Sequence, residues 1–439
     1  MREMKDSGVE WIGEIPDKWQ TRKLFYLLSL IGSGTTPKGD EYYTGIGIPW
    51  LNTGDLNDGY IYSTDKYVSE NALNDYSALQ VYKPGSIVIA MYGATIGKLG
   101  LTEIELTTNQ ACCVMNTTKE MDRKILFYIL MTAKDYFIFL SYGAGQPNIS
   151  QKTIKHLKIP FANICEQKKI ANYLDAKCSK IDEIIEKQQA IIEKLKEYKL
   201  SIITEVVTKG LNPDVEMMES GAEFVGKIPQ NWSIAKLGNL FDFIGGYAFN
   251  SEMYVSESQN QVVRIGNVKN GYMLLDSNPV FVNDETAERA NKFLIKPNYI
   301  LFTMTGTKGK RDYFFTHVVT EEDCKGKRLY INQRVGCFVA KKGVHPAYYG
   351  YLLKDNKILD GIFLYETGTA NQGNLGIDSI SRTKVHVPPY EEQCKIAEYL
   401  DKKCNMIDSN IYEKGRLIIK LQEYKKSLIY EVVTGKKEV

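Results

Sequence analysis

A glycine- and lysine-containing stretch, YGATIGKLG at residues 92–100, has the residue types of a phosphate-binding loop. Such a loop has a glycine, four further residues and then Gly-Lys-Ser/Thr, and its backbone N–H groups surround a nucleotide phosphate. Here Gly93 stands one residue too close to Gly97, and Leu99 replaces the hydroxyl that would bind magnesium. The stretch GTKGKRD at residues 306–312 fails the same test. Neither stretch predicts a nucleotide-hydrolysing site.

Two further patterns also fall short of catalysis. VPPY at residues 387–390 resembles the Asn/Asp-Pro-Pro-Tyr/Phe motif of amino-methyltransferases, whose leading oxygen accepts a hydrogen bond from the target amine. Val387 has no such oxygen, so we interpret the segment as a strand end before a proline-initiated helix. The histidines lack metal-ligand spacing and are interpreted as surface or strand-end residues. They are His156, His317, His345 and His386.

Loops rich in Gly, Asn, Gln, Thr, Lys and Arg remain as functional candidates. Amide and cationic side chains read base edges, and a glycine-rich backbone can approach phosphates closely. In the first half of the chain the predicted DNA-binding residues are Thr35, Thr36, Lys38, Tyr92, Lys98, Gln146, Asn148 and Lys152. In the second half they are Lys269, Lys308, Lys310, Arg311, Asn371, Gln372 and Asn374. For each loop taken alone, an ordinary turn is the competing interpretation.

The chain contains an internal duplication. EWIGEIPDKW at residues 10–19 returns as EFVGKIPQNW at residues 223–232. EQKKIANYLDAKCSKID, from residue 166, returns from residue 392 as EQCKIAEYLDKKCNMID, and KLKEYKLSIITEVVT returns as KLQEYKKSLIYEVVT at the same offset of 226 residues. A period above 200 residues indicates a duplicated domain rather than a solenoid. Each half is predicted to be a mixed α/β body with strands at SIVIAMYG and YILFTMTG, followed by a helical tail.

The two tails are predicted to be long helices over residues 166–208 and 392–434. Asn163 can cap the first helix, and Gly210 and Gly435 stand just beyond the two ends. Apolar residues recur every seven positions, as in a coiled coil. The seam residues are Leu174, Ile181, Gln188, Leu195 and Ile202 in the first helix, and Leu400, Ile407, Lys414, Leu421 and Leu428 in the second.

The matching seams predict that the two helices pair with each other in antiparallel orientation. This arrangement would place the two bodies at opposite ends, related by a pseudo-twofold axis. It would also bring the equivalent polar residues Gln188 and Lys414 close together, where they could fix the register. Packing alone is the competing interpretation of the heptads.

Composition limits the class of protein. The chain has 439 residues, of which 44% are hydrophobic, so two or three packed domains are expected. The net charge of +2 gives no independent argument for nucleic acid. The eight cysteines show no metal or disulfide spacing, and the charged N-terminus does not resemble a signal peptide. A soluble, cytoplasmic protein with reduced thiols is expected.

Four features, whose order occurs twice along the chain, carry a family resemblance. They are GSGTTPKGDEYYTGIGIPWLNTGDL, NQACC, YGAGQPNISQKTIKHLKIP and the repeated EQ-KIA tails. With them the chain resembles, over its whole length, the specificity subunit of type I restriction–modification systems. The resemblance implies an α+β fold with two target-recognition domains separated by two long helices in an antiparallel coiled coil. The implied domains are residues 1–163, 164–210, 211–388 and 389–439.

The resemblance also implies a function. Each recognition domain would read one part of a bipartite, asymmetric target in double-stranded DNA with an unread spacer. The chain would dock two modification (methyltransferase) subunits and the restriction (translocase/nuclease) subunits. It would have no catalytic residues, cofactor or metal of its own, because S-adenosylmethionine, ATP and magnesium belong to those partners. The rival interpretations are a non-catalytic protein-binding scaffold on a coiled-coil spacer and an enzyme in its own right.

Overall fold

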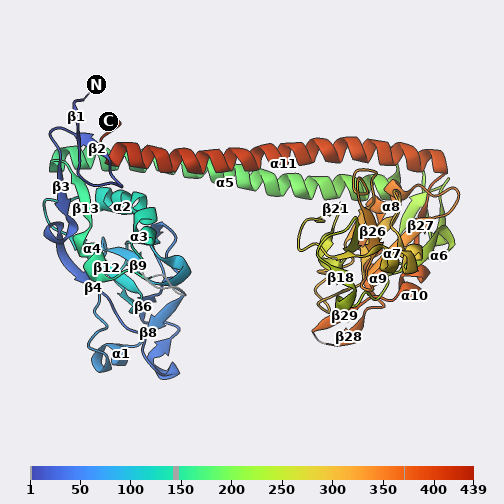
Figure 1. Ribbon diagram of the computed structural model, residues 1–439, viewed down its shortest axis with the longest axis horizontal. Helices are drawn as coiled ribbons and strands as arrows, with labels where there is room; N and C mark the ends of the chain where they lie inside the picture. Colours follow the sequence, from blue (N-terminus) through green and yellow to red (C-terminus); the bar gives the residue numbers. More distant parts are fainter. Residues whose placement is uncertain (1, 142–147, 370) are drawn as a thin grey trace. The chain divides into compact units, whose positions relative to one another are not determined.

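The computed structural model describes residues 2–141, 148–369 and 371–439, and the chain divides into two compact units. Unit 1 combines Met1–Gln189 with Gly415–Val439, and unit 2 comprises Ala190–Lys414. Each unit therefore contains one α+β body and part of each of two long helices (Figure 1). Among the described residues, no helix combines the length and apolar character needed to cross a bilayer.

The body of unit 1 is built from short strands and helices. The strands are β1 (Met4–Asp6), β2 (Glu14–Pro16), β3 (Gln20–Lys23), β4 (Leu28–Gly32), β5 (Tyr43–Thr44), β6 (Ile48–Leu51), β7 (Gly59–Ile61), β8 (Lys66–Val68), β9 (Ile87–Ala90), β10 (Leu99–Thr102), β11 (Thr107–Thr108), β12 (Cys112–Thr117) and β13 (Lys158–Phe161). The helices are α1 (Glu70–Asp75), α2 (Arg123–Thr132), α3 (Lys134–Phe139) and α4 (Gln151–His156), with short 3-10 turns η1 (Leu24–Leu27), η2 (Asp40–Tyr42) and η3 (Gly93–Thr95). The strands form sheets β4-β12-β9-β10-β7 and β11-β6-β8-β5, and ribbons β1-β2 and β13-β3.

The body of unit 2 has a corresponding set of elements. Its strands are β14 (Met217–Glu219), β15 (Lys227–Pro229), β16 (Ser233–Lys236), β17 (Phe241–Gly245), β18 (Tyr254–Val255), β19 (Asn260–Val263), β20 (Val268–Lys269), β21 (Tyr272–Met273), β22 (Phe281–Val282), β23 (Ile300–Thr303), β24 (Thr305–Gly306), β25 (Thr316–Val318), β26 (Arg328–Ile331), β27 (Val335–Ala340), β28 (Thr367–Thr369), β29 (Gln372–Asn374) and β30 (Lys384–Val387). Its helices are α6 (Leu237–Leu240), α7 (Asp284–Arg289), α8 (Pro346–Leu352), α9 (Asn356–Phe363) and α10 (Ile377–Arg382), with 3-10 turns η4 (Ser251–Met253), η5 (Ile265–Asn267) and η6 (Asn291–Phe293).

The two bodies have the same strand order even where their sequences have diverged. The order β4-β12-β9-β10 in unit 1 matches β17-β27-β23-β25 in unit 2, with antiparallel neighbours throughout. The order β5-β8-β6-β11 matches β18-β22-β19-β26, and in both sheets the last pair is parallel. The two bodies therefore share one topology, as the repeated motifs predicted.

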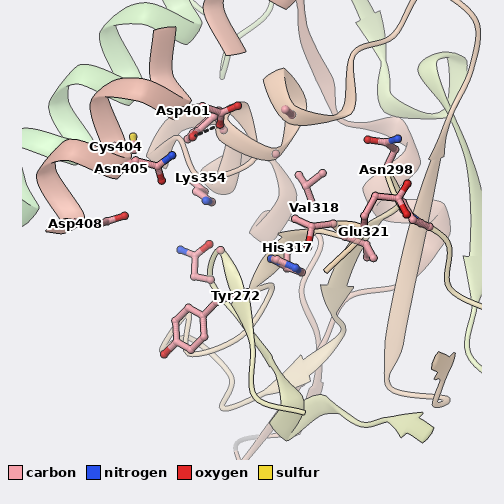
Figure 2. Close-up of a pocket in the computed structure, with 18 of the residues that line it drawn as sticks. Tyr272, Asn298, His317, Val318, Glu321, Lys354, Asp401, Cys404, Asn405 and Asp408 are labelled. Atoms are coloured by element: carbon pink, nitrogen blue, oxygen red, sulfur yellow. Dashed lines mark hydrogen bonds between the residues drawn. The ribbon is translucent and has the colours of Figure 1, made fainter. Parts of the chain in front are cut away.

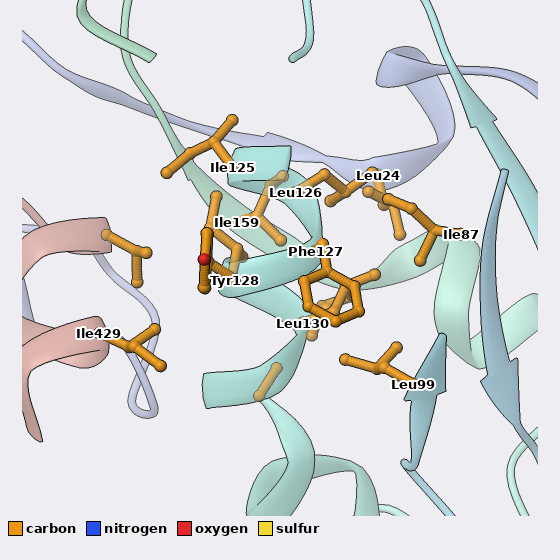
Figure 3. Packing of buried hydrophobic residues seen from close by; sticks show 14 of the residues in the cluster. Leu24, Ile87, Leu99, Ile125, Leu126, Phe127, Tyr128, Leu130, Ile159 and Ile429 are labelled. Atoms are coloured by element: carbon orange, nitrogen blue, oxygen red, sulfur yellow. The ribbon is translucent and has the colours of Figure 1, made fainter. Parts of the chain in front are cut away.

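The central strand of each larger sheet is buried on both faces. In β9, Ile87 and Ile89 belong to a core that also contains residues of α2; Figure 3 shows Ile87 in this core. Val88 and Ala90 belong to a second core that includes Leu51 of β6. Alternate residues of a strand point to opposite faces, so a strand between two cores must be apolar at every position. This explains the uninterrupted apolar run in SIVIAMYG, which sequence analysis identified as a strand.

The two long helices are α5 (Ile164–Lys209) and α11 (Tyr390–Val433). The predicted cap of α5 is confirmed, because the N–H of Glu166 donates to Oδ1 of Asn163 at 3.0 Å. The glycines beyond both helix ends have positive φ, +80° at Gly210 and +73° at Gly435, where a side chain would be strained.

The predicted seam packs in antiparallel orientation. In unit 1, Asp182 of α5 pairs with Lys425 of α11 at 2.7 Å; in unit 2, Lys199 pairs with Asp408 at 2.6 Å. The buried seam residues are Leu174, Ile181 and Leu428 in unit 1, and Ile202, Leu400 and Ile407 in unit 2, with Leu421 and Leu195 packed partly buried against these clusters. Gln188 belongs to unit 1 and Lys414 to unit 2, so their expected proximity stays a prediction.

A buried glutamine fastens the start of α5 to the body of unit 1. The side chain of Gln167 is 2% exposed, and its amide nitrogen donates to the carbonyls of Ala162 at 2.8 Å and Glu120 at 3.0 Å. Its oxygen accepts from the N–H of Asp122, which caps α2, at 2.8 Å. One side chain therefore connects the long helix, a turn and the start of α2.

Gln393 does the same at the start of α11 in unit 2. Its nitrogen donates to the carbonyls of Pro388 at 2.9 Å and Gly343 at 3.4 Å, and its oxygen accepts from the N–H of His345 before α8. The neighbouring glutamates complete the match, because the indole of Trp19 donates to Glu166, and the indole of Trp232 donates to Glu392, both at 3.0 Å. The two repeated sequence motifs therefore recur together because they touch.

A buried histidine gives unit 2 a specific dependence on pH. His386 of β30 is 1% exposed, and its ring lies 6.0 Å from that of Trp232. Burial lowers the pKa of His386 to about 4 from its ordinary 6.5, so the folded state holds a neutral imidazole. Below pH 6.5 the unfolded chain binds a proton that the folded chain binds only near pH 4, so stability falls as the pH is lowered through this window.

We therefore predict that His386→Phe removes part of the acid sensitivity of unit 2. Between pH 7.5 and pH 4, the wild-type protein should lose about 3 kcal/mol more than the variant, from 1.36 kcal/mol per pKa unit. Urea unfolding of both proteins at the two pH values measures this difference, since all other titrating groups are shared. Equal losses in both proteins would show that His386 does not carry the effect.

Candidate nucleic-acid interface

The candidate loops of unit 1 leave the larger sheet at one edge. Strand β4 ends at Gly32, β9 ends at Ala90, and β12 begins at Cys112, and the strand register places these three ends together. The first loop cluster is defined as residues 33–38, 91–98, 109–111 and 148–152. The cluster is assembled by strand pairing, because its segments are far apart in the sequence.

Contacts between side chains and backbones hold the first loop cluster together. The hydroxyl of Thr36 donates to Oε1 of Gln110 at 2.8 Å, and the amide of Gln151 donates to the hydroxyl of Ser33 at 3.2 Å. Tyr92 forms an isolated antiparallel bridge with Asn148. Three of the predicted residues, Thr36, Tyr92 and Asn148, are thus brought to one exposed surface.

The other predicted residues of unit 1 have different surroundings. The carbonyl of Thr35 accepts from the indole of Trp50 at 3.0 Å, and the N–H of Lys38 donates to the hydroxyl of Tyr76 at 2.9 Å. The side chains of Lys38 and Lys152 are exposed, whereas Lys98 is half-buried in the turn before β10. Gln146 lies outside the described residues.

The loops of unit 2 leave the equivalent edge. Strand β17 ends at Gly245, β23 ends at Thr303, and β27 begins at Val335, again in adjacent register. The second loop cluster is defined as residues 246–250, 304–312, 332–334, 367–369 and 371–375. Each unit has an equivalent backbone hydrogen bond here. In unit 2 the N–H of Leu375 donates to the carbonyl of Met304 at 3.0 Å, and in unit 1 the N–H of Ile149 donates to the carbonyl of Met91 at 2.9 Å.

A carboxylate holds the second loop cluster together. Glu366 accepts from the N–H of Gly309 at 3.0 Å and from the hydroxyl of Tyr313 at 2.7 Å. Burial, followed by this hydrogen bond to the carboxylate, raises the pKa of Tyr313. The ammonium of Lys308 donates to the carbonyl of Gly368 at 3.0 Å. The glycine-rich loop before Tyr313 and the strand after Glu366 therefore form one assembly.

The four predicted cations of unit 2 have four different surroundings. Lys308 is tied to β28, and Lys310 is exposed. Arg311 is already paired, with its guanidinium 2.5 Å from Asp360 and 5.6 Å from the ring centre of Phe363. Lys269 lies on the β20-β21 ribbon, which is paired with neither β28 nor β29, so the structure does not bring it together with the others. Asn371, Gln372 and Asn374 are all exposed.

The β20-β21 ribbon belongs to a different feature, a cavity of about 810 Å³ that also includes α8 and α11 in its walls (Figure 2). Tyr272 and Lys354 line it, and burial lowers the pKa of Lys354. Tyr351 donates to Asp401 at 2.7 Å in its wall.

The matching place in unit 1 is occupied by a lysine. Tyr128 donates to Asp175 at 2.8 Å, as Tyr351 does to Asp401, and the ammonium of Lys124 lies 2.5 Å from the same carboxylate. One turn before Tyr351, unit 2 has Ala347 where unit 1 has Lys124. The cavity therefore reflects a difference between the two copies, away from the loop clusters.

A family model described as "Type I restriction modification DNA specificity domain" matches the chain twice, over residues 16–197 and 229–418. The two matches cover most of the chain and coincide with its two halves. The chain belongs to this type I restriction–modification DNA specificity family. Membership confirms the predicted resemblance, the internal duplication and the role in recognising DNA sequence rather than in catalysis.

Similar proteins are named as specificity subunits of type I restriction enzymes. The MjaIX specificity subunit of Methanocaldococcus jannaschii is 28% identical over 310 residues, covering 67% of this chain and 68% of its own. The MjaVIII specificity subunit of the same organism is 24% identical and covers 96% of this chain and 93% of its own. The specificity subunit of EcoKI from Escherichia coli is 19% identical over 96% of this chain and 90% of its own.

Solved structures share the fold. A chain from a study titled "Structural basis underlying complex assembly and conformational transition of the type I R-M system" has a TM-score of 0.71 and 14% identity, covering 95% of this chain and 98% of its own. The HsdS subunit from Thermoanaerobacter tengcongensis has a TM-score of 0.53 and 14% identity, covering 96% of this chain and 98% of its own. These likenesses confirm the predicted fold class of two α+β bodies with a coiled coil of long helices.

In this specificity protein, sequence reasoning missed several residues that organise the loop clusters. Gln110 and Gln151 hold the first cluster, and Glu366 holds the second. The signal for Gln110 was available, because Asn-Gln stands before the strand in both halves, at residues 109–110 and 332–333. Glu366 has no such signal, because its partners are more than 50 residues away in the chain.

Replacing Glu366 should loosen the second loop cluster selectively. We predict that Glu366→Ala leaves the N–H of Gly309 and the hydroxyl of Tyr313 without their acceptor, so that residues 306–312 exchange amide hydrogens at least ten-fold faster. Hydrogen exchange with mass spectrometry measures this, with peptides of the first loop cluster as the internal control. Asp378→Ala, at an exposed carboxylate on α10, is the matched control variant. Unchanged exchange in residues 306–312 of Glu366→Ala would contradict the organising role.

Proposed function

We propose that the first loop cluster reads one part of a bipartite, asymmetric DNA target and the second loop cluster reads the other, with an unread spacer between them. The observation that carries this proposal is the shared architecture of the two sheet edges. Both edges gather polar loops from segments distant in the sequence, and the loops differ while their supports are alike. This arrangement suits two recognition domains that prefer different DNA sequences.

The side chains at the clusters suit the two kinds of contact that DNA recognition requires. Lys38 and Lys152 in unit 1 and Lys310 in unit 2 are exposed cations that can neutralise phosphates. Asn148 and Gln372 are exposed amides of the type that reads base edges. Arg311 would have to leave Asp360 before it could bind DNA, so we assign it first to loop structure.

The modification subunits are proposed to dock on the long helices. Tyr198 and Ile191 of unit 2 are 56% and 38% exposed, and the equivalent residues of unit 1, Tyr424 and Leu417, are 53% and 42% exposed. Exposed apolar residues at matched positions of the two units support the proposal that a partner covers this surface. Because each unit presents the same pair, two modification subunits are expected. S-adenosylmethionine, ATP and magnesium are assigned to these and to the restriction subunits.

Exchanging one body tests the proposal. Residues 20–161, from the start of β3 to the end of β13, should be replaced by the corresponding body of a family member of known specificity. This exchange retains Trp19, Glu166 and Gln167, which fasten the body to α5. We predict that the half of the methylated motif read by the exchanged body changes, and that the half read by the second body is retained. Sequencing of methylated DNA from cells expressing the hybrid with its modification subunit gives the result.

The reciprocal hybrid, with residues 233–387 exchanged, is the matched control and should change only the other half of the motif. If either exchange altered both halves, or neither altered any, the assignment of one reader to each body would be wrong.

A further inference from the structure

The second loop cluster contains a small sheet with two different faces. Its strand order is β24-β29-β28, with both neighbours of β29 antiparallel to it. Figure 1 shows β28 and β29 at the end of unit 2 away from its helix α11. Since alternate residues of a strand point to opposite faces, the pairing determines which side chains share a face.

One face of this sheet has a row of three glycines, and the protein covers the central one, Gly373. Gly373 pairs with Gly306 on one side and with Gly368 on the other. A Cβ at Gly373 would lie 2.3 Å from Oε1 of Glu366 and 2.8 Å from the hydroxyl of Tyr313. Glycine at position 373 is therefore required for Glu366 and Tyr313 to pack against the backbone of the sheet.

The opposite face bears only uncharged polar side chains. Asn374 pairs with Thr367, and Gln372 pairs with Thr369, so these four side chains project together. All four residues are exposed, whereas Gly373 between the two amides is buried. The face thus has two amides along one strand, each beside a threonine, and the protein behind it holds the ribbon in place.

The dimensions of this face match duplex DNA. The major groove is about 12 Å wide and admits a two-stranded ribbon. Residues i and i+2 of a strand are about 6.6 Å apart, and two base-pair steps are about 6.8 Å. Asn374 and Gln372 can therefore face base pairs two steps apart when the ribbon follows the groove. Asn and Gln donate to and accept from N7 and N6 of adenine in a bidentate manner, and threonine can contact the thymine methyl group.

We propose that the β28-β29 ribbon enters the major groove at the second part of the target, and that Asn374 and Gln372 read two adenines two base pairs apart. This inference rests on the proposed function and adds the reading element, the groove and the bases. Lys310, exposed on the neighbouring loop, serves the phosphates beside the ribbon. Lys308 and Glu366 are positioning residues, since they hold the sheet and face away from the bases.

The test uses modified DNA with the complex of this chain and its modification subunits. Methylation sequencing first gives the target. Each adenine of the second part is then replaced in turn by 7-deazaadenine, which lacks the N7 acceptor but keeps base pairing. Affinity should fall about ten-fold at two adenines separated by two steps. Replacement by 3-deazaadenine, which alters the minor groove, should have little effect.

Variants assign each adenine to a side chain. Each variant should bind the unmodified target more weakly than wild type does. Asn374→Ala should lose no further affinity when one of the two adenines is replaced by 7-deazaadenine, and Gln372→Ala should lose none when the other adenine is replaced. Asn270→Ala, at an exposed amide on the β20-β21 hairpin, is the matched control and should behave as wild type.

The inference is overturned if the second part of the target contains no adenine on either strand, or if no 7-deazaadenine position weakens binding. It is also overturned if both ribbon variants weaken binding to all DNA equally, since this would show backbone contact only. The proposed function has a separate failure, in which exchange of a whole body leaves the motif unchanged. A ribbon variant that fails to fold would bind both parts of the target more weakly. In that case the deazaadenine series with the wild-type protein tests the inference.

Discussion

The structure depends on a buried glutamine at the start of each long helix. Gln167 and Gln393 each connect a helix start to a turn and to the N–H of the residue just before a second helix, through three hydrogen bonds of a buried side chain. Leaving such a buried group unpaired costs about 1–3 kcal/mol for each polar atom, so the geometry around it has little freedom. The adjacent glutamates, bonded to Trp19 and Trp232, fix the entry of the chain into each body.

The hydrogen bonds of these glutamines belong to the part of each unit that is the same in both copies, whereas the loops differ. The helix starts, the sheet order and the sheet edge are the same in both units, and the same glutamine–glutamate pair holds each helix start to its body. The loops beyond the edge are held by contacts of their own, with Gln110 and Gln151 in one unit and Glu366 in the other. A loop can therefore change its sequence, and its preference for bases, without disturbing the support. Duplication followed by divergence of the loops gives two readers on one chain.

Much of this organisation could be predicted from the sequence, because its signals are local or repeated. The heptads of Leu174 and Leu400 and the cap at Asn163 depend on neighbours within a few residues, and the structure confirms them. The position of Lys269 depends on where a short hairpin packs, with the N–H of Gly271 donating to the carbonyl of Thr316 in β25, and periodicity cannot reveal such a contact. Glu366 was missed for the same reason, since its partners come close only after folding. The assignment of individual residues to DNA contacts stays a prediction.

Photocrosslinking of the bound complex tests the central claim, that each body reads its own part of the target, most directly. Thymines in either part of the target are replaced by 5-iodouracil, and the crosslinked peptides are identified by mass spectrometry. The account predicts that one part crosslinks to residues 33–38, 91–98, 109–111 or 148–152, and the other to residues 246–250, 304–312, 332–334, 367–369 or 371–375. Crosslinks from both parts to the same body, or from either part to α5 or α11, would contradict it.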